Sequence, residues 1–152
     1  MEMSLAQVID ILKALLTPAI AVVTLFIAWQ QWKTNKRKIE LDRYERRLHI
    51  YQEIQRFISR IPNSRNVSID ELSNFRAAVS EADFIFGPEI PKYINEICLH
   101  WRELWRFNQE YRDNTQETPE GYNHQTISEG IKNHSIWLIK QLDISKEKFK
   151  KY

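Results

Sequence analysis

The sequence predicts an all-α protein with one N-terminal transmembrane helix that continues into a cytosolic antiparallel four-helix bundle. Three observations support this fold class: only three glycines and five prolines interrupt 152 residues, apolar residues recur at helical spacings of three and four, and one early stretch lacks charge altogether. The expected organisation is a transmembrane segment (1–32), a basic juxtamembrane helix (33–47) and a cytosolic helical bundle (48–152).

The uncharged stretch covers residues 14–32. At a helical rise of about 1.5 Å per residue it is about 28 Å long, which matches a hydrocarbon core of about 30 Å. A cleaved signal peptide is the competing interpretation. The preceding charges are Glu2 and Asp10 against Lys13, and no small-x-small cleavage site follows. We therefore expect the span to remain in the mature protein.

Positive charge gathers directly after the span. Segment 33–47 has a net charge of +4, whereas 48–152 has −1. The positive-inside rule then predicts an inner-membrane protein with its N-terminus outside and its C-terminal domain in the cytoplasm. We expect contact with anionic lipid headgroups rather than with nucleic acid, which would need a basic face on the folded domain. The expected headgroup contacts are Trp29, Trp32, Lys33, Lys36, Arg37 and Lys38.

The first helix is predicted to run over about 4–61, because nothing after Pro18 stops it before Pro62. Its cytosolic part carries one apolar stripe: Leu41, Tyr44, Leu48, Tyr51, Ile54, Ile58 and Ile61. A polar loop at 62–67 leads to a capping box that starts at Ser68.

The second helix is predicted to end at Gly87-Pro88, the third to cover about 90–112 and the fourth about 125–150, with a loop at 114–123. Their expected inward faces comprise Leu72, Phe75, Val79, Ala82 and Phe86, then Ile94, Ile97, Trp101, Leu104 and Trp105, then Ile127, Ile131, Leu138, Leu142 and Phe149. Short connections favour antiparallel neighbours.

Small and polar residues recur through the span at spacings of 4, 3, 4, 3, 4 and 3, so they share one heptad face. Small residues let helices approach closely in lipid, and hydroxyls can bond across the interface. The pattern predicts a homo-oligomer; the alternative is that one of the seven heptad frames is polar by chance. The predicted oligomer or pore face is Asp10, Ala14, Thr17, Ala21, Thr24, Ala28 and Gln31.

The same heptad frame stays hydrophilic beyond the span, at Asn35, Lys38, Asp42, Glu45, His49 and Gln52. In a ring of copies these residues would extend a polar line, as a water-filled conduit requires. The alternative is an ordinary solvated face. Asp10 and Lys13, one turn apart, are expected to form a terminal ion pair rather than a gate.

The residues do not indicate an enzyme. Arg43 and His49 have the formal spacing of a helical nuclease motif, but six residues place them about 120° apart around a helix. No phosphate-binding loop, nucleophile elbow or carboxylate cluster is present. No histidine has a partner four residues away, so neither a metal site nor a cofactor is expected. The single cysteine, Cys98, is typical of a reducing compartment.

Two motifs carry a resemblance to a known family. Residues 41–51 are similar to a pattern of the form LDLFDRRFxVY, and residues 81–90 to EAxFLFGxEI. The chain resembles a widespread family of short single-span bacterial membrane proteins without an assigned function, and residues 148–152 resemble its ending. In layout it is also similar to the membrane accessory proteins of type VI CRISPR systems. That likeness implies a membrane-perturbing effector in antiviral defence.

Two classes of function remain from the sequence. The first is an oligomeric inner-membrane effector or pore whose cytosolic domain senses a partner. The second is a membrane-tethered adaptor whose helical bundle docks a cytosolic protein.

Overall fold

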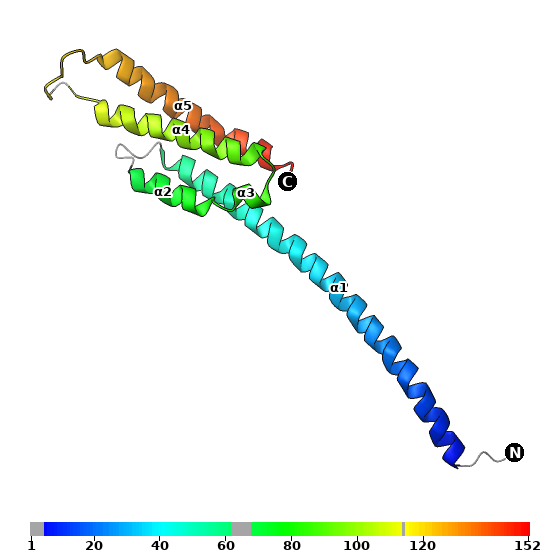
Figure 1. Ribbon diagram of the computed structural model, residues 1–152. Coiled ribbons are helices and arrows are strands. Elements are labelled where there is room, and N and C mark those ends of the chain that lie inside the picture. The colour runs from blue at the N-terminus through cyan, green and yellow to red at the C-terminus, as the bar shows by residue number, and fades with distance from the viewer. Residues whose placement is uncertain (1–4, 62–67, 114) are drawn as a thin grey trace. The chain divides into compact units, whose positions relative to one another are not determined.

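The computed structural model describes residues 5–61, 68–113 and 115–152, apart from the side chain of Leu12. The regular elements of these residues are all helices, which confirms the all-α part of the predicted fold class (Figure 1). The predicted loop at 62–67 lies outside the described residues, as does Asn114 at the start of the predicted loop at 114–123. The helices are α1 (Leu5–Ser59), α2 (Ile69–Ala78), α3 (Ala82–Ile85), α4 (Glu89–Glu110) and α5 (His124–Phe149).

The chain divides into two compact units, Met1–Arg43 and Tyr44–Tyr152. We call them the N-terminal unit and the C-terminal unit. The N-terminal unit consists of the first part of α1, which is long and apolar enough to cross a bilayer. None of its most apolar 18-residue window is buried within the protein. A core helix of a soluble domain would bury most of such a window.

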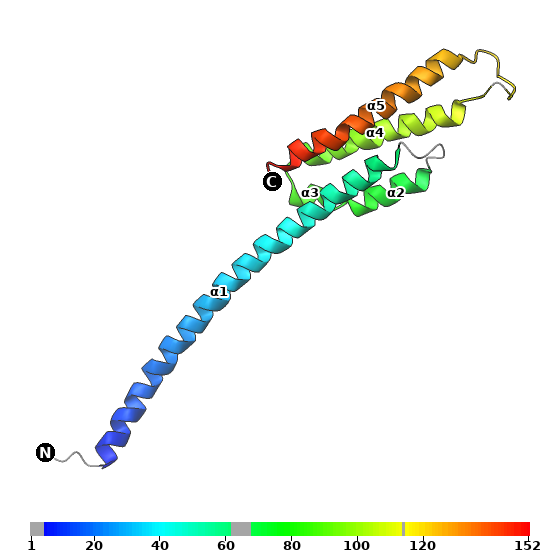
Figure 2. The same cartoon turned by 180° about the vertical axis from the view of Figure 1, so that it is seen from behind.

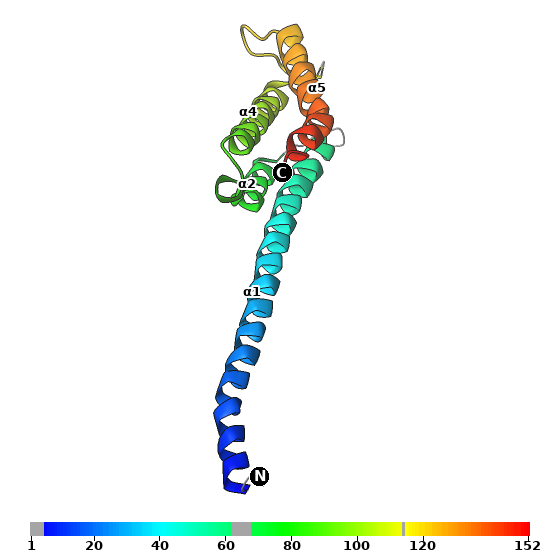
Figure 3. The same ribbon diagram turned by 90° about the vertical axis from the view of Figure 1, so that its right-hand side faces the viewer.

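The C-terminal unit is built around α4, whose inward face is buried throughout. In the ribbon views α4 lies between α5 and α2 (Figures 1 and 2), and α2 again adjoins α4 in the view turned by 90° (Figure 3). The indole of Trp101 is fully buried, and Phe57 of α1 stacks on Phe75 of α2 with ring centroids 4.1 Å apart. Aromatic stacking and apolar burial therefore join three helices in one core.

The helix starts follow capping chemistry. The hydroxyl of Ser68 accepts a hydrogen bond from the backbone N–H of Asp70 at 3.2 Å, which confirms Ser68 as the N-cap of the predicted capping box. The return bond from Glu71 stays a prediction. At the start of α5, the Asn123 side chain accepts from the backbone N–H of Thr126 at 3.1 Å. Each cap satisfies a backbone donor that has no partner within its helix.

A buried polar network fixes how α1, α4 and α5 pack. Gln55 of α1 donates to the Leu142 carbonyl at 2.8 Å and to the Ser145 hydroxyl at 2.6 Å. Tyr93 of α4 donates to the Gln141 carbonyl at 3.2 Å, and burial raises the pKa of this phenol. Because buried polar groups are costly when unpaired, these bonds favour one register of the three helices.

The predicted second helix is wrong in its middle. Instead of one helix up to Gly87, α2 ends at Ala78 and α3 begins at Ala82. Between them the N–H of Ser80 bonds the Ala77 carbonyl at 3.3 Å and the N–H of Ala82 bonds the Val79 carbonyl at 3.0 Å. These tight i→i+3 bonds turn the chain, and all the residues predicted to face inward on this segment are still buried.

The predicted stripe on α1 is wrong at its first three members. Leu41, Tyr44 and Leu48 are exposed, and burial in the core begins at Ile50. The stripe has the correct period, but the described part of the chain leaves its first three members exposed. On α4 and α5, all the residues predicted to face inward are buried or packed against the core.

Candidate functional site

The first candidate site is the small and polar face of α1. All seven predicted residues lie in unbroken α-helix and are exposed: Asp10, Ala14, Thr17, Ala21, Thr24, Ala28 and Gln31. Their heptad spacing keeps them on one side of the helix. The face offers close approach at the alanines and hydrogen-bonding groups between them, and its role in an oligomer stays a prediction.

Two local features leave hydrogen-bond acceptors in this part of α1. The Thr24 hydroxyl donates to the Ile20 carbonyl at 2.8 Å, so its oxygen remains able to accept a further hydrogen bond. Pro18 lies inside α1 and has no N–H, so it cannot donate to the carbonyl of Ala14. Such groups can bond a neighbouring helix or hydrate a passing cation.

The predicted headgroup contacts form two stacked pairs. The ammonium of Lys33 lies 5.4 Å from the ring centroid of Trp29, and that of Lys36 lies 5.9 Å from the ring centroid of Trp32. Each pair is four residues apart, which places both members on one helix face. Arg37 and Lys38 are also exposed. An indole beside an ammonium suits the boundary between acyl chains and anionic headgroups.

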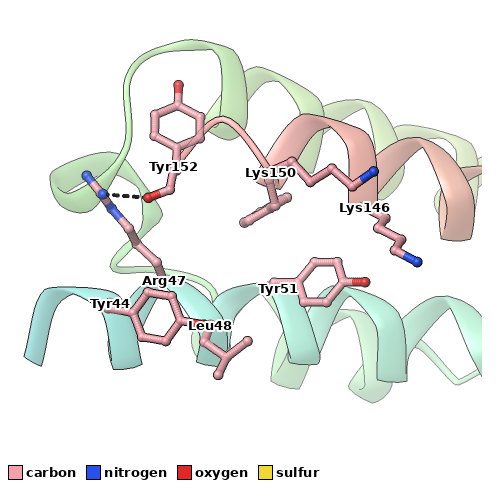
Figure 4. Close-up of a pocket in the computed structure, with 8 residues that line it drawn as sticks. Tyr44, Arg47, Leu48, Tyr51, Lys146, Lys150 and Tyr152 are labelled. Carbon is pink, nitrogen blue, oxygen red and sulfur yellow. Dashed lines mark hydrogen bonds between the residues drawn. The ribbon is translucent and has the colours of Figure 1, made fainter. Parts of the chain in front are cut away.

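The second candidate site is a groove in the C-terminal unit, with a volume of about 350 Å³ (Figure 4). One wall comes from α1 and the other from the end of α5 and the residues after it. The groove is lined by Tyr44, Arg47, Leu48, Tyr51, Lys146, Phe149, Lys150 and Tyr152. Most of its surface is apolar, and we call it the α1–α5 groove.

Arg47 fixes one end of this groove. Its guanidinium donates to the Ile85 carbonyl at 3.2 Å and to the Tyr152 carbonyl at 3.1 Å, the latter drawn as a dashed line in Figure 4. The same group lies 5.6 Å from the ring centroid of Phe86 and 5.5 Å from that of Tyr152. Arg47 therefore holds α1, the end of α3 and residue 152 together, which is a structural role.

The other two cations of the groove are Lys146 of α5 and Lys150, which directly follows this helix. Lys146 and Lys150 are both exposed and lie one helical turn apart. Lys150 also holds an ion pair with Glu147 at 2.5 Å, and this hydrogen bond lowers the pKa of the Glu147 carboxyl. The groove thus combines apolar walls with a cationic rim, an arrangement suited to a partner that is both apolar and acidic.

The structure also brings together two histidines that the sequence did not relate. The Nδ1 atoms of His100 on α4 and His134 on α5 are 3.0 Å apart, and Trp137 stacks on His100 with ring centroids 3.6 Å apart. Burial and the neighbouring His134 lower the pKa of His100. Within the described parts of the chain, no group of three metal-ligating side chains includes this pair.

His49 is one of the two residues with the formal nuclease spacing, and it lies on α1 within the C-terminal unit. The imidazole of His49 lies 3.8 Å from Glu53, the residue one turn further along α1, and is exposed. Comparisons with protein-family models, with curated proteins and with solved structures found no match.

Proposed function

We propose that this chain is a homo-oligomeric, single-pass protein of the bacterial inner membrane that perturbs or perforates that membrane. One observation carries the proposal: the most apolar window of α1 is wholly unburied, and its small and polar residues share one face. An exposed apolar helix favours lipid as its surroundings. A face of alanine and threonine within it favours contact with identical helices.

The proposed arrangement places the polar face inward in a ring of copies. Thr17, Thr24 and Gln31 would then line a conduit, because hydroxyl and amide groups can hydrate ions where apolar side chains leave a dewetted barrier. The N-terminus would lie outside and the C-terminal unit, an antiparallel four-helix bundle, in the cytoplasm, with Trp29 and Trp32 at the headgroups. Antiviral defence is the pathway that the resemblance implies.

A membrane-tethered adaptor is the second candidate, and the α1–α5 groove is the observation that favours it. Its apolar walls and cationic rim would suit a cytosolic protein with an acidic, apolar segment. The two proposals differ in what they require of the membrane helix. A pore needs the helices to associate and conduct, whereas an adaptor needs only an anchor.

The oligomer is tested by adding bulk to its predicted face. Ala21→Leu with Ala28→Leu should prevent close approach and shift the mass measured by native mass spectrometry in mild detergent toward monomer. Ala19→Leu makes the same chemical change off the face and should leave the oligomer intact. A wild type that is monomeric in several mild detergents, or a control variant that dissociates as much as the double variant, would contradict the proposal.

A further inference from the structure

Phe84 is the most exposed large hydrophobic side chain of the described residues, with 90% of its surface open to solvent. It lies on α3, and its neighbours along the chain are anchored: Ala82 and Phe86 are buried, and Ile85 packs against the core. The backbone N–H of Phe84 bonds the Glu81 carbonyl at 3.0 Å. The ring is thus held outward by a fixed backbone rather than by a loose terminus.

Acidic charge accompanies this ring. Asp83, directly before Phe84, is exposed. Glu81 lies in the same turn and pairs with Arg46 at 3.3 Å. The turn therefore presents an aromatic side chain next to a carboxylate, and we call Asp83 and Phe84 the α3 knob.

The α1–α5 groove has the complementary chemistry. Tyr44 and Leu48 line it with 58% and 38% of their surfaces exposed, although their helical period matches that of the core residues. Lys146 and Lys150 lie at its rim. Lys150 shares its charge with Glu147, so Lys146 supplies most of the positive charge there. Because Phe84 is almost wholly exposed, it does not occupy the groove of its own chain.

We propose that the α3 knob of one copy inserts into the α1–α5 groove of a second copy, with Phe84 against Tyr44 and Leu48. Asp83 then faces the two lysines of the rim, so apolar and charge complementarity act together. This inference rests on the proposed homo-oligomer and adds a contact outside the membrane helix. Each copy uses different surfaces for its two neighbours, so the contact is head-to-tail and can close a ring.

Cross-linking of the full chain in detergent tests the contact while keeping Phe84 in place. One chain carries Asp83→Cys and a differently tagged chain carries Lys146→Cys. A short bis-maleimide should link the two tags when the chains are mixed. Neither variant should link to itself, because the contact is head-to-tail. The native Cys98 stays, since it is buried.

A further variant tests whether the link depends on the Phe84 ring or only on the two chains being close together. Phe84→Ala in the Asp83→Cys chain leaves the thiol in place but removes the ring. Burying a phenylalanine side chain changes association by roughly 10- to 100-fold, so the link should be lost at low protein concentration. Replacing Leu99, an exposed residue of α4, by alanine is the matched control and should leave the link unchanged.

Several outcomes overturn the inference. Absence of the link in mixed chains, self-linking of the Asp83→Cys chain, or a link that survives Phe84→Ala would each do so. If vesicles of anionic phospholipid bind through Lys146 and Lys150 and abolish the link at equal protein density, the groove holds lipid and the proposal is wrong. If the groove instead binds an acidic protein, the link between chains does not depend on Phe84, and the proposal is wrong.

The fate of the inference is separable from that of the proposed function. Linked chains that never depolarise a membrane would support the head-to-tail contact and contradict the pore. A chain that depolarises membranes as an oligomer without forming the link would support the pore and overturn the contact. Measuring the link in the Ala21→Leu and Ala28→Leu background isolates the contact further, because association through the membrane helix is then blocked.

Discussion

Replacing Arg47 by methionine should destabilise the C-terminal unit by about 2 kcal/mol, although the side chain is only half-buried. The hydrogen bond to the Ile85 carbonyl, at 3.2 Å and partly buried, contributes about 1.5 kcal/mol as a charged donor. The bond to the Tyr152 carbonyl, at 3.1 Å and exposed, contributes about 0.5 kcal/mol. Contacts with the rings of Phe86 and Tyr152 contribute about 0.5 kcal/mol each.

One opposing effect lowers this total. The Nε of Arg47 is buried and has no hydrogen-bond partner among the residues described, and removing it recovers about 1 kcal/mol. Methionine keeps most of the apolar stem, so the loss reports the guanidinium rather than a cavity. Arg47→Lys keeps the charge but cannot reach both carbonyls in the same way, so it should recover less than half of the loss.

The assay is urea unfolding of the full chain in one detergent. Tryptophan fluorescence monitors the unfolding, because the buried Trp101 becomes exposed to solvent. Arg46→Met is the matched control. The Arg46 side chain is exposed, and its ion pair with Glu81 at 3.3 Å contributes about 0.5 kcal/mol. Equal unfolding midpoints for Arg47→Met and Arg46→Met would refute the assigned role of Arg47.

Two further predictions concern the packing of α4 against α5. Gly130→Ala should destabilise the protein by about 1 kcal/mol despite the better helix propensity of alanine, because a Cβ there would lie 2.7 Å from ring atoms of Phe107. Thermal unfolding measures this loss. The prediction is wrong if the added change Phe107→Leu does not reduce the loss. Burial and His134 lower the pKa of His100 below 6.5, so its stabilising contribution is complete above that pH and declines as the pH falls below it. Unfolding midpoints from about pH 8 to about pH 5 should therefore fall less in a His134→Asn variant, and an equal fall would contradict the coupling.

Most helix positions were predictable because they depend on local chemistry, which the sequence displays directly. The Ser68 cap and the inward face of α4 depend on neighbouring residues and on a 3.6-residue period, and both were predicted correctly. The break between α2 and α3 was missed, because no glycine or proline marks residues 79–81. A turn that is closed by backbone hydrogen bonds needs no particular side chain, so the sequence does not mark it.

Burial and long-range proximity were harder to predict for a physical reason. Tyr44 and Leu48 have the same spacing as Ile54 and Ile58, and only the position of α5 decides which of them is covered. His100 and His134 are separated by 34 residues, so their contact depends on how α4 and α5 align. The small and polar face of α1 follows a regular sequence spacing, whereas the 90% exposure of Phe84 depends on the fold and has no sequence signal.

The central claim is that the polar face of α1 conducts ions in an assembled membrane protein. Thr17→Val with Thr24→Val keeps size and β-branching but removes both hydroxyls, including the one that donates to Ile20. The deciding measurement is the response of a membrane-potential dye in producing cells, normalised to the amount of oligomer. The wild type should depolarise the inner membrane, and the double variant should do so less per assembled particle. Equal depolarisation per particle, or a wild type that never depolarises the membrane, would contradict the account.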